Sequence, residues 1–346
     1  MSAARAFENG SGPGAAHTFT ALGVGRHAFA VIDYLLKAGR WQLVSASDRS
    51  AAAYARFQSS YHDRQIPFYA SVAEALTATQ PEVAYIAATA PAHVALAESV
   101  LAAGFGGQLL IEKPIACSLA EADRLLEGLL AQPATRRVAV NFNRRGAPLY
   151  QSVKAVVRSG ELGRLKHIDY KRDMKLSMKG SHYIDLINWY MGAPLATVTA
   201  ELAADSSVDT RGAFFYDPGG WVEIEYASGQ TARIDAVDHF PDLGEGLCLE
   251  FELGRIQVDV NESAARLMSR QGERELAAEA AVTYAWIANV FEALVSPAEP
   301  CVLCSVAEAA DSLAVIVAAQ WSHRHGRAPV AFPLPADIRS EVLRLA

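Results

Sequence analysis

In the first half of the chain, short apolar runs alternate with longer segments whose apolar residues recur at helical spacing. The runs predict strands and the periodic segments predict helices. The predicted strands lie at 18–25, 41–48, 67–70, 83–90 and 109–112, and the predicted helices at 27–38, 51–60, 72–79 and 94–103. Such alternation through short loops indicates a parallel sheet covered by helices on both faces, which is a doubly wound, Rossmann-type α/β domain.

The pattern changes near residue 145, where alternating polar and apolar positions become the main signal. Helices are predicted at 148–159, 182–190, 282–294 and 306–323, and strands at 165–170, 197–202, 213–216, 220–226, 231–237, 247–253 and 255–260. Runs of strands separated by turn residues are typical of antiparallel sheets. The second half is therefore predicted to be an α+β domain with a mostly antiparallel open sheet.

A chain of 346 residues that is about half apolar is long enough for two domains. We expect a disordered tail at 1–17, a dinucleotide-binding domain at 18–140, and a substrate-binding and oligomerisation domain at 141–346. The tail is rich in alanine, glycine and serine, and it lacks the apolar core of a secretory signal. Later segments fall short of the ~18 consecutive apolar residues of a membrane span. We therefore predict a cytoplasmic protein without a membrane partner.

Charge and cysteine content narrow the function further. The formal charge of −7 is spread along the chain, which argues against a nucleic-acid partner. Four cysteines are too few for a disulfide framework in a chain of this length. Cys301 and Cys304 form a Cys-x-x-Cys pair, but neither a second pair nor a histidine cluster completes a zinc site. We predict that the pair packs at a helix start and that the protein holds no metal.

A glycine-rich turn joins the first predicted strand to the first predicted helix. It reads Gly23-Val24-Gly25-Arg26-His27-Ala28, a G-x-G-x-x-A pattern. Gly23 would allow the tight turn, Gly25 the approach of a pyrophosphate, and Ala28 close packing of helix on sheet. Arg26 and His27 would lie beside the phosphates. The placement predicts a dinucleotide site, although an ordinary glycine turn has the same letters.

Asp48 follows Ala28 by twenty residues and ends the second predicted strand. A carboxylate there would accept hydrogen bonds from an adenosine ribose and repel a 2′-phosphate, which favours NAD over NADP. Arg49 leaves NADP possible, since its guanidinium could stack on adenine or pair with that phosphate.

Two later motifs carry candidate chemistry. Glu112-Lys113-Pro114 follows the fifth predicted strand, and the proline restricts the backbone of Lys113. His182 begins a helix, and its imidazole titrates near neutral pH. Oxidation of an alcohol needs a cation near the oxygen and a base for its proton, and Lys113 and His182 suit these roles. A solvated lysine and a histidine of a helical first turn are the ordinary alternatives.

The order of these motifs resembles that of the Gfo/Idh/MocA family of NAD(P)-dependent oxidoreductases, which act mostly on sugars, cyclitols and nucleotide sugars. The resemblance covers nearly the whole chain. Its motifs are the glycine turn, Glu112-Lys113-Pro114, Asn143-Arg144-Arg145, Ser159-Gly160-Glu161-Leu162-Gly163, Gly180-Ser181-His182-x-x-Asp185, and the closing segment 307–319 with Ser322, Gly326 and Arg327. It implies an oxidoreductase that forms a homodimer or homotetramer.

The resemblance also implies roles for further residues. Thr89, His93, Glu112 and Lys113 would line the cofactor, with His93 near the nicotinamide ribose. Arg144, Arg145 and Lys179 would bind the substrate with Lys113 and His182. The guanidinium groups of the two arginines could clamp phosphate oxygens, although at least one of the two is expected to be a surface charge.

Asp185 lies one helical turn beyond His182, where it would orient the histidine, bind substrate hydroxyls, or remain a solvated acid. Many members of the family carry an aspartate four residues before this histidine, but here that residue is Met178. Either Lys113 and His182 suffice, or Asp185 substitutes, or ordinary dehydrogenation has been lost.

These observations favour hydride transfer between a secondary alcohol of a sugar, nucleotide sugar or cyclitol and NAD. Two alternatives stay open, namely a catalytically silent dinucleotide-binding sensor and an NADP-dependent biosynthetic keto-sugar reductase.

Overall fold

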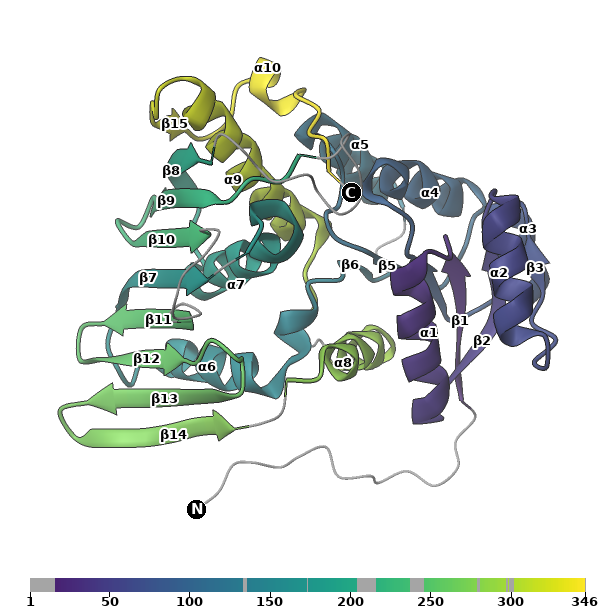
Figure 1. Cartoon of the computed structure of the whole chain (residues 1–346), viewed down its shortest axis with the longest axis horizontal. Coiled ribbons are helices and arrows are strands. Elements are labelled where there is room, and N and C mark those ends of the chain that lie inside the picture. The colour runs from purple at the N-terminus through teal and green to yellow at the C-terminus, as the bar shows by residue number, and fades with distance from the viewer. Residues whose placement is uncertain are drawn as a thin grey trace.

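The computed structural model describes residues 16–132, 136–172, 174–203, 216–236, 246–278, 281–296, 298 and 302–345. Two β-sheets lie beside each other with helices packed between them, and the chain finishes one sheet before it starts the other (Figure 1). Among the helices in these ranges, none combines the length and the apolar character that crossing a membrane requires.

The first sheet has six parallel strands in the order β3-β2-β1-β4-β5-β6, so the predicted doubly wound domain is confirmed. Its strands are β1 (His17–Leu22), β2 (Trp41–Ser47), β3 (Phe68–Tyr69), β4 (Val83–Ile86), β5 (Gln108–Ile111) and β6 (Val138–Val140). Its helices are α1 (Arg26–Ala38), α2 (Ala51–Tyr61), α3 (Val72–Thr79), α4 (Ala90–Ala102) and α5 (Leu119–Leu130). The structure thus adds α5 and β6 to a series that the sequence pattern closed at residue 112.

The strand predicted at 83–90 is too long. It ends at Ile86, because Pro91 lies in the first turn of α4 and favours a helix that begins at Ala90. At the other end of the sheet, His17 was assigned to the tail but is the first residue of β1, paired with Trp41. The remainder of the predicted tail lies largely outside the described residues.

The second sheet has nine strands in the order β14-β13-β12-β11-β7-β10-β9-β8-β15, and only the β7–β10 pair among them is parallel. The strands are β7 (Leu165–Arg172), β8 (Leu195–Leu202), β9 (Gly220–Tyr226), β10 (Thr231–Ala236), β11 (Gly246–Phe251), β12 (Gly254–Val258), β13 (Ala264–Ser269), β14 (Gly272–Ala278) and β15 (Val330–Ala331). The helical elements are η1 (Asn143–Gly146), α6 (Pro148–Ser159), η2 (Leu176–Gly180), α7 (Ser181–Met191), α8 (Thr283–Val295), α9 (Val306–Arg324) and α10 (Ala336–Arg339). The predicted α+β half with a mostly antiparallel sheet is confirmed.

The sequence pattern missed the β13–β14 hairpin. Most of β14 is exposed and polar, so it lacks the apolar alternation by which strands are recognised. The strand predicted at 213–216 falls mostly in 213–215, outside the described residues.

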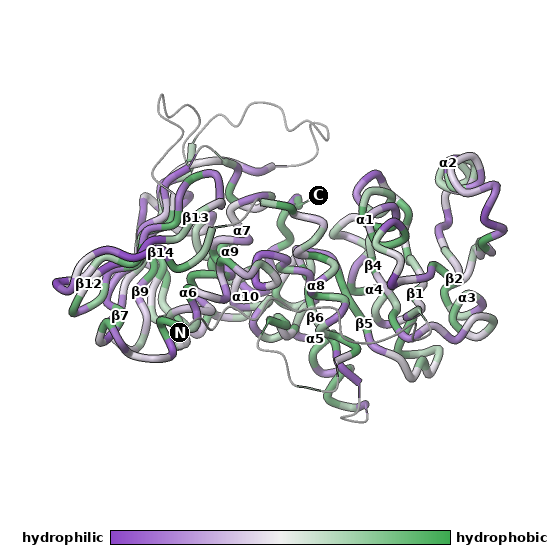
Figure 2. The backbone as a smooth tube through the Cα atoms, turned by 90° about the horizontal axis from the view of Figure 1, so that it is seen from below, coloured by the Kyte–Doolittle hydropathy of each residue, from purple (hydrophilic) through white to green (hydrophobic). Residues whose placement is uncertain are grey.

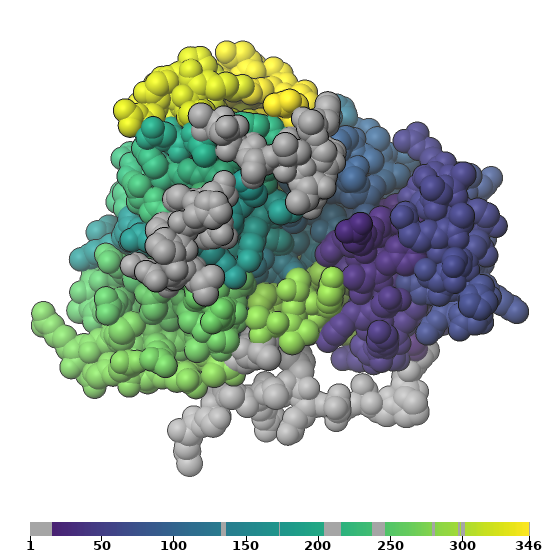
Figure 3. Space-filling model, in the orientation of Figure 1, coloured from purple at the N-terminus to yellow at the C-terminus, as the bar shows by residue number. Residues whose placement is uncertain are grey.

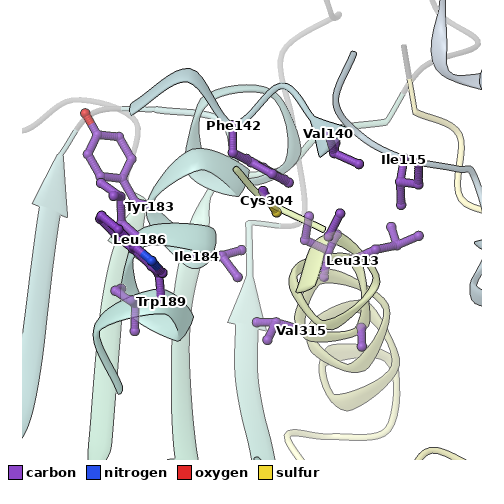
Figure 4. Packing of buried hydrophobic residues seen from close by; sticks show 14 of the residues in the cluster. Ile115, Val140, Phe142, Tyr183, Ile184, Leu186, Trp189, Cys304, Leu313 and Val315 are labelled. Atoms are coloured by element: carbon purple, nitrogen blue, oxygen red, sulfur yellow. The ribbon is translucent and has the colours of Figure 1, made fainter. Parts of the chain in front are cut away.

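One face of the second sheet is buried beneath helices. In β9, Val222, Ile224 and Tyr226 are buried while Glu223 and Glu225 face outward. Figure 2 shows the polar tips of this sheet and the more apolar segments between the two sheets. Figure 4 shows α7 and α9 packing together beside Val140 and Phe142, at the end of β6.

Helix α8 joins the two halves of the molecule. It follows the second sheet in sequence, but it packs on the first, where the buried ring of Phe291 contacts Phe19, Trp41 and Tyr85 at centroid distances of 5.7, 5.1 and 5.3 Å. The guanidinium of Arg137 donates to carbonyl oxygens at the end of α8. In the space-filling view, α8 lies against α1 along the seam between the halves (Figure 3).

Candidate active site

Lys113 lies immediately beyond the carboxyl end of β5, in a turn whose Lys113–Pro114 peptide is cis. Its Nζ donates a hydrogen bond of 2.5 Å to the carbonyl oxygen of Met178, four residues before His182. Two motifs that are 65 positions apart in sequence therefore meet at one edge of the parallel sheet. Doubly wound folds bind ligands at this edge.

Glu112, the residue before Lys113, anchors the same turn through its buried carboxylate. Its Oε1 accepts hydrogen bonds from the Tyr85 hydroxyl and the Asn141 amide, both at 2.6 Å, and lies 3.3 Å from His27 Nε2. Burial by itself would raise the pKa of Glu112, but the hydrogen bonds from His27, Tyr85 and Asn141 lower it to about 2. Glu112 is thus a buried carboxylate that ties the glycine turn to the Lys113 turn. It is too enclosed to be the cofactor ligand that the sequence predicted.

The glycine turn has the backbone that a dinucleotide needs. Gly23 has φ of +86°, and a Cβ there would lie 2.7 Å from the amide nitrogen of Ala88. Around Gly25, by contrast, a Cβ would meet no described atom within 4 Å outside the adjoining backbone, and no described side chain caps the start of α1 there. Open space beside uncapped amides at a helix start suits a pyrophosphate, so these residues fit the predicted cofactor.

Asp48 is placed to complete that site. Its two carboxylate oxygens accept from the amides of Val24 and Ser50, at 3.0 and 2.8 Å, which fixes the carboxylate beside the glycine turn. Arg26, Arg49 and Thr89 are exposed, and Ala28 is buried under the turn. We therefore keep Asp48, Arg26, Arg49 and Thr89 as candidate contacts of a bound dinucleotide.

His182 opens α7 with its ring set edge-on against Phe142, at a centroid distance of 5.7 Å. Its Nδ1 is buried and has no hydrogen-bond partner among the described residues. Burial lowers the pKa of His182 well below its usual value, and the positive charges of Arg144, Lys113, His27 and Lys179 lower it further. The imidazole is therefore neutral near pH 7.

The contact of His93 with a nicotinamide ribose remains a prediction, and the structure gives the histidine backbone partners instead. It is 1% exposed, with Nδ1 2.7 Å from the carbonyl oxygen of Pro114 and Nε2 2.9 Å from that of Ala88. Burial lowers its pKa. Both ring nitrogens face backbone carbonyls, so His93 bridges the segment after β4 to the Lys113 turn.

The predictions for Asp185 and Arg145 are also corrected. Asp185 is 0% exposed, and its oxygens accept hydrogen bonds of 2.7 and 2.8 Å from Arg145, which is itself 1% exposed. Burial disfavours the charge on Arg145, but Asp185, Cys304 and Glu308 together raise its pKa. With both partners buried and satisfied, Asp185 cannot orient His182 and Arg145 cannot clamp a substrate.

Arg144 points to a different buried acid. Its Nη2 donates to Glu262 at 2.9 Å, and its guanidinium lies 4.5 Å from the centroid of the Tyr183 ring. Arg172 and the Tyr183 hydroxyl donate to the same carboxylate. Arg144 is therefore a buried residue that pairs with Glu262 and Tyr183, and it does not face solvent as a phosphate clamp would. Because Glu262 lies in a turn of the second sheet, far away in sequence, the sequence pattern gave no signal for it.

A second carboxylate that the sequence analysis missed lies next to Lys113's partner. Asp217 is 7% exposed and accepts from the backbone amides of Ser177 and Met178 at 2.6 and 2.7 Å. Lys179, in the same short η2 segment, is half-buried, whereas Met178 is 37% exposed. The Asp-Pro-Gly sequence at 217–219 reads as an ordinary turn, so only the tertiary structure reveals its position.

Several polar side chains at the junction of η1 and α7 have buried atoms without a hydrogen-bond partner in the described part of the chain. They are Asn143 Oδ1, Arg144 Nε, Ser177 Oγ, Ser181 Oγ and His182 Nδ1. Such atoms are usually completed by ordered water or by a ligand.

In the ranges that the structure describes, no group of three or more histidine, cysteine or acidic side chains is placed to hold a metal ion. Cys304 is buried and its thiol lies 3.3 Å from Asp185 Oδ1, beside the start of α9. Cys301 lies outside the described residues.

Residues 18–142 match the family model described as "Oxidoreductase family, NAD-binding Rossmann fold". An inositol 2-dehydrogenase from Streptomyces avermitilis is 31% identical over 193 residues, which is 49% of this chain and 55% of that protein. A putative oxidoreductase, YteT, from Bacillus subtilis is 24% identical over 140 residues, 34% of this chain and 32% of that protein. The matches thus span about half or less of these curated relatives.

Solved structures agree over nearly the whole chain. An oxidoreductase from Agrobacterium radiobacter, in complex with NAD+, L-tartaric acid and magnesium, has a TM-score of 0.73 at 17% identity, covering 91% of this chain and 98% of that one. The WlbA dehydrogenase from Bordetella pertussis, in complex with NADH and UDP-GlcNAcA, has a TM-score of 0.71 at 22% identity. The alignment covers 92% of this chain and 100% of that one. At these identities the likeness concerns the fold. Taken with the sequence match and the glycine turn, it supports the resemblance to the Gfo/Idh/MocA family of oxidoreductases, whose NAD-binding Rossmann-fold model residues 18–142 match.

Proposed function

We propose that the protein is an NAD(P)-dependent oxidoreductase that exchanges a hydride between nicotinamide and a secondary alcohol of a sugar, nucleotide sugar or cyclitol. The main support is the 2.5 Å hydrogen bond from Lys113 to Met178, because it brings the lysine to the segment that leads into His182. The contact between His27 and Glu112 brings the glycine turn to the same place.

The proposed roles follow from charge and position. A bound nicotinamide would supply the hydride acceptor, held by the glycine turn and Asp48. Lys113 Nζ would donate a hydrogen bond to the reacting oxygen and stabilise its negative charge as the carbinol hydrogen leaves. The neutral imidazole of His182 would accept the hydroxyl proton. In the reverse direction, the same two groups would stabilise and protonate the oxygen of a ketone.

The substrate class is supported by chemistry and by relatives. Apart from Arg144, the unpartnered atoms at the η1–α7 junction are an amide oxygen, an imidazole nitrogen and two hydroxyls that can both donate and accept, which matches the mixed hydrogen bonding of a polyol. The relatives named inositol 2-dehydrogenase support a cyclitol, and the WlbA complex with UDP-GlcNAcA supports a nucleotide sugar.

The test is turnover with a panel of cyclitols, sugars, sugar acids and nucleotide sugars, measured as NADH absorbance. We expect at least one compound to be oxidised and Lys113→Met to lower kcat at least about a hundredfold without loss of dinucleotide binding. The matched control is Lys166→Met, a lysine exposed on β7. A Lys113→Met variant with full turnover would contradict the assignment.

A sensor without catalysis is the second candidate, favoured by Met178 and by the low pKa of His182, which makes it a weak base. Tight NAD binding with no turnover on any compound in the panel would support it.

The choice between NAD and NADP is proposed from Asp48. We expect tighter binding of NAD, and we expect Asp48→Ala to narrow the difference, because the variant removes the carboxylate that would repel a 2′-phosphate. Titration calorimetry with both cofactors measures this, and tighter NADP binding would support the biosynthetic keto-sugar reductase.

A cytoplasmic location and assembly into a homodimer or homotetramer also remain predictions. Light scattering checks the assembly, which a monomeric mass would refute.

A further inference from the structure

We propose that Asp217 is a positioning residue for Lys113. It holds the backbone of Met178, whose carbonyl oxygen receives the lysine's hydrogen bond, and it supplies a buried negative charge opposite the ammonium group. This inference rests on the proposed function only in its consequence for turnover, because the positioning itself can be measured without a substrate.

The first step of the argument is how η2 is anchored. The amides of Ser177 and Met178 donate to the two oxygens of Asp217, at 2.6 and 2.7 Å, and the amide of Leu176 donates to the carbonyl of Pro218 at 3.2 Å. Three consecutive amides of one segment are thus bound by two consecutive residues of another. No described side chain caps η2 from its own flanking residue, so Asp217 performs that function from the turn before β9.

The second step is that both contacts meet in one residue. Met178 donates through its amide to Asp217 and accepts through its carbonyl from Lys113. The Met178 carbonyl shares a planar peptide unit with the Lys179 amide, which donates to the Lys175 carbonyl at 3.3 Å. The peptide units on both sides of the Met178 Cα are therefore held by hydrogen bonds. A shift of η2 would therefore move the acceptor away from Lys113 Nζ.

The third step concerns charge. Burial raises the pKa of Asp217, while the two amides and the charge of Lys113 lower it. Among the described residues, the titratable groups in this region include Glu112, His93, His182, Arg144, Lys179, His27 and Lys175, which flanks η2. Asp217 and Glu112 are the acids in this set, and Asp217 is the one that accepts from the Met178 amide.

A carboxylate is required because each of its oxygens accepts an N–H. In Asp217→Asn, one of the two positions becomes an NH₂ group that faces another donor, so one hydrogen bond is lost together with the charge. Asp217→Glu keeps the charge and serves as the conservative variant.

The experiment measures the titration of Lys113 by its pH-dependent acylation, followed by mass spectrometry of the peptide that carries it. We expect the midpoint to fall by about one pH unit in Asp217→Asn and to change less in Asp217→Glu, because an ammonium loses its counter-charge in the first variant only. The control is Glu252→Gln, an exposed carboxylate that accepts the Arg164 amide at 3.1 Å in a turn of the second sheet. An unchanged midpoint in Asp217→Asn, or an equal fall in the control, would overturn the proposal.

A reciprocal measurement covers the case in which Asp217→Asn does not fold. In the otherwise unaltered protein, Lys113→Met should raise the midpoint at which the Asp217 carboxyl titrates, followed by carbon-13 NMR, because coupling between two charges is mutual. An unchanged Asp217 midpoint would contradict the proposed interaction.

Turnover then separates this inference from the proposed function. If the protein is an enzyme, Asp217→Asn should lower kcat with little change in the KM for the dinucleotide. A shifted Lys113 midpoint in a protein that oxidises nothing would refute the enzyme and retain the positioning role. Turnover together with an unshifted Lys113 midpoint in Asp217→Asn would support the enzyme and refute the positioning role.

Discussion

The guanidinium of Arg145 and the carboxylate of Asp185 form a two-pronged ion pair, with N–O distances of 2.7 and 2.8 Å, that is almost wholly excluded from solvent. Arg145 also donates to Glu308 at 2.8 Å, in the first turn of α9. The pair therefore fastens η1 and α7 to α9. The sequence analysis placed Arg145 and Asp185 in the active site, but in the structure they form a buried ion pair that joins helices.

We expect Arg145→Met to lower the free energy of unfolding by about 3–5 kcal/mol, because it leaves a buried carboxylate without its partner. The double variant Arg145→Met with Asp185→Leu should recover much of that loss, since it removes both charges. Urea denaturation measures both effects. Breaking the exposed Arg274–Glu161 pair with Arg274→Met should cost less than about 1 kcal/mol. A stable Arg145→Met protein with a raised KM for its substrate would restore the substrate-clamp role.

The two glycines of the first turn should respond differently to a side chain. Gly23→Ala places a Cβ against the backbone of Ala88 at a positive φ, so we expect a clear loss of thermal stability. Gly25→Val meets no described atom within 4 Å, so the fold should be retained while NAD affinity falls at least about tenfold, because the side chain occupies the space beside the helix start. Melting curves and titration calorimetry distinguish the two effects. Unchanged NAD binding in Gly25→Val would place the dinucleotide elsewhere.

His182 should set an unusually low acid limit for turnover. Its pKa is depressed by burial and by neighbouring cations, so it stays neutral, and able to accept a proton, below the usual pH range of histidine. Lys179→Gln removes one of those cations and should raise this pKa, which moves the acid limb of kcat/KM to higher pH by a few tenths of a pH unit. Lys166→Gln, on the exposed side of β7, is the control. An acid limb that moves down or stays in place would argue against His182 as the base.

Glu112 should make stability depend on pH in acid. Its pKa is about 2 in the folded protein against the usual 4.5, so its contribution is present above pH 4.5 and is lost as the pH falls toward 2. From this difference in pKa, we expect the free energy of unfolding of the native protein to fall by up to about 3 kcal/mol more between pH 4.5 and pH 2 than that of Glu112→Gln. Denaturant titrations at several pH values measure the two slopes. Equal slopes would mean that the hydrogen bonds from Tyr85, Asn141 and His27 do not hold the carboxylate in its charged form.

Local sequence was informative wherever a residue's role depends on its own segment. The helix bounds at Val72–Thr79 and Pro148–Ser159 were predicted to the residue, because capping residues and a proline mark their starts. The turn at Gly23 and the acid at Asp48 were recognisable for a similar reason, since the spacing between a strand, a glycine turn and the next strand end is set by one βαβ unit. By contrast, β14 escaped notice because an exposed strand carries no apolar alternation.

The two-part architecture, the dinucleotide turn and the candidate pair Lys113 and His182 were all predictable from local sequence patterns. Which charged residues face the site depended on how the chain packs. It paired Asp185 with Arg145 and Arg144 with Glu262, enclosed His93 between two carbonyls, and placed Asp217 beneath Met178. The role of a charged side chain in a folded protein depends on the group that it pairs with. The partners of these charged residues lie 39 or more positions away in the sequence. The carbonyls of Ala88 and Pro114, which contact His93, lie nearer in the sequence. Periodicity and spacing report on neighbours in the chain, whereas burial and ion pairing are settled by how the two sheets and their helices pack.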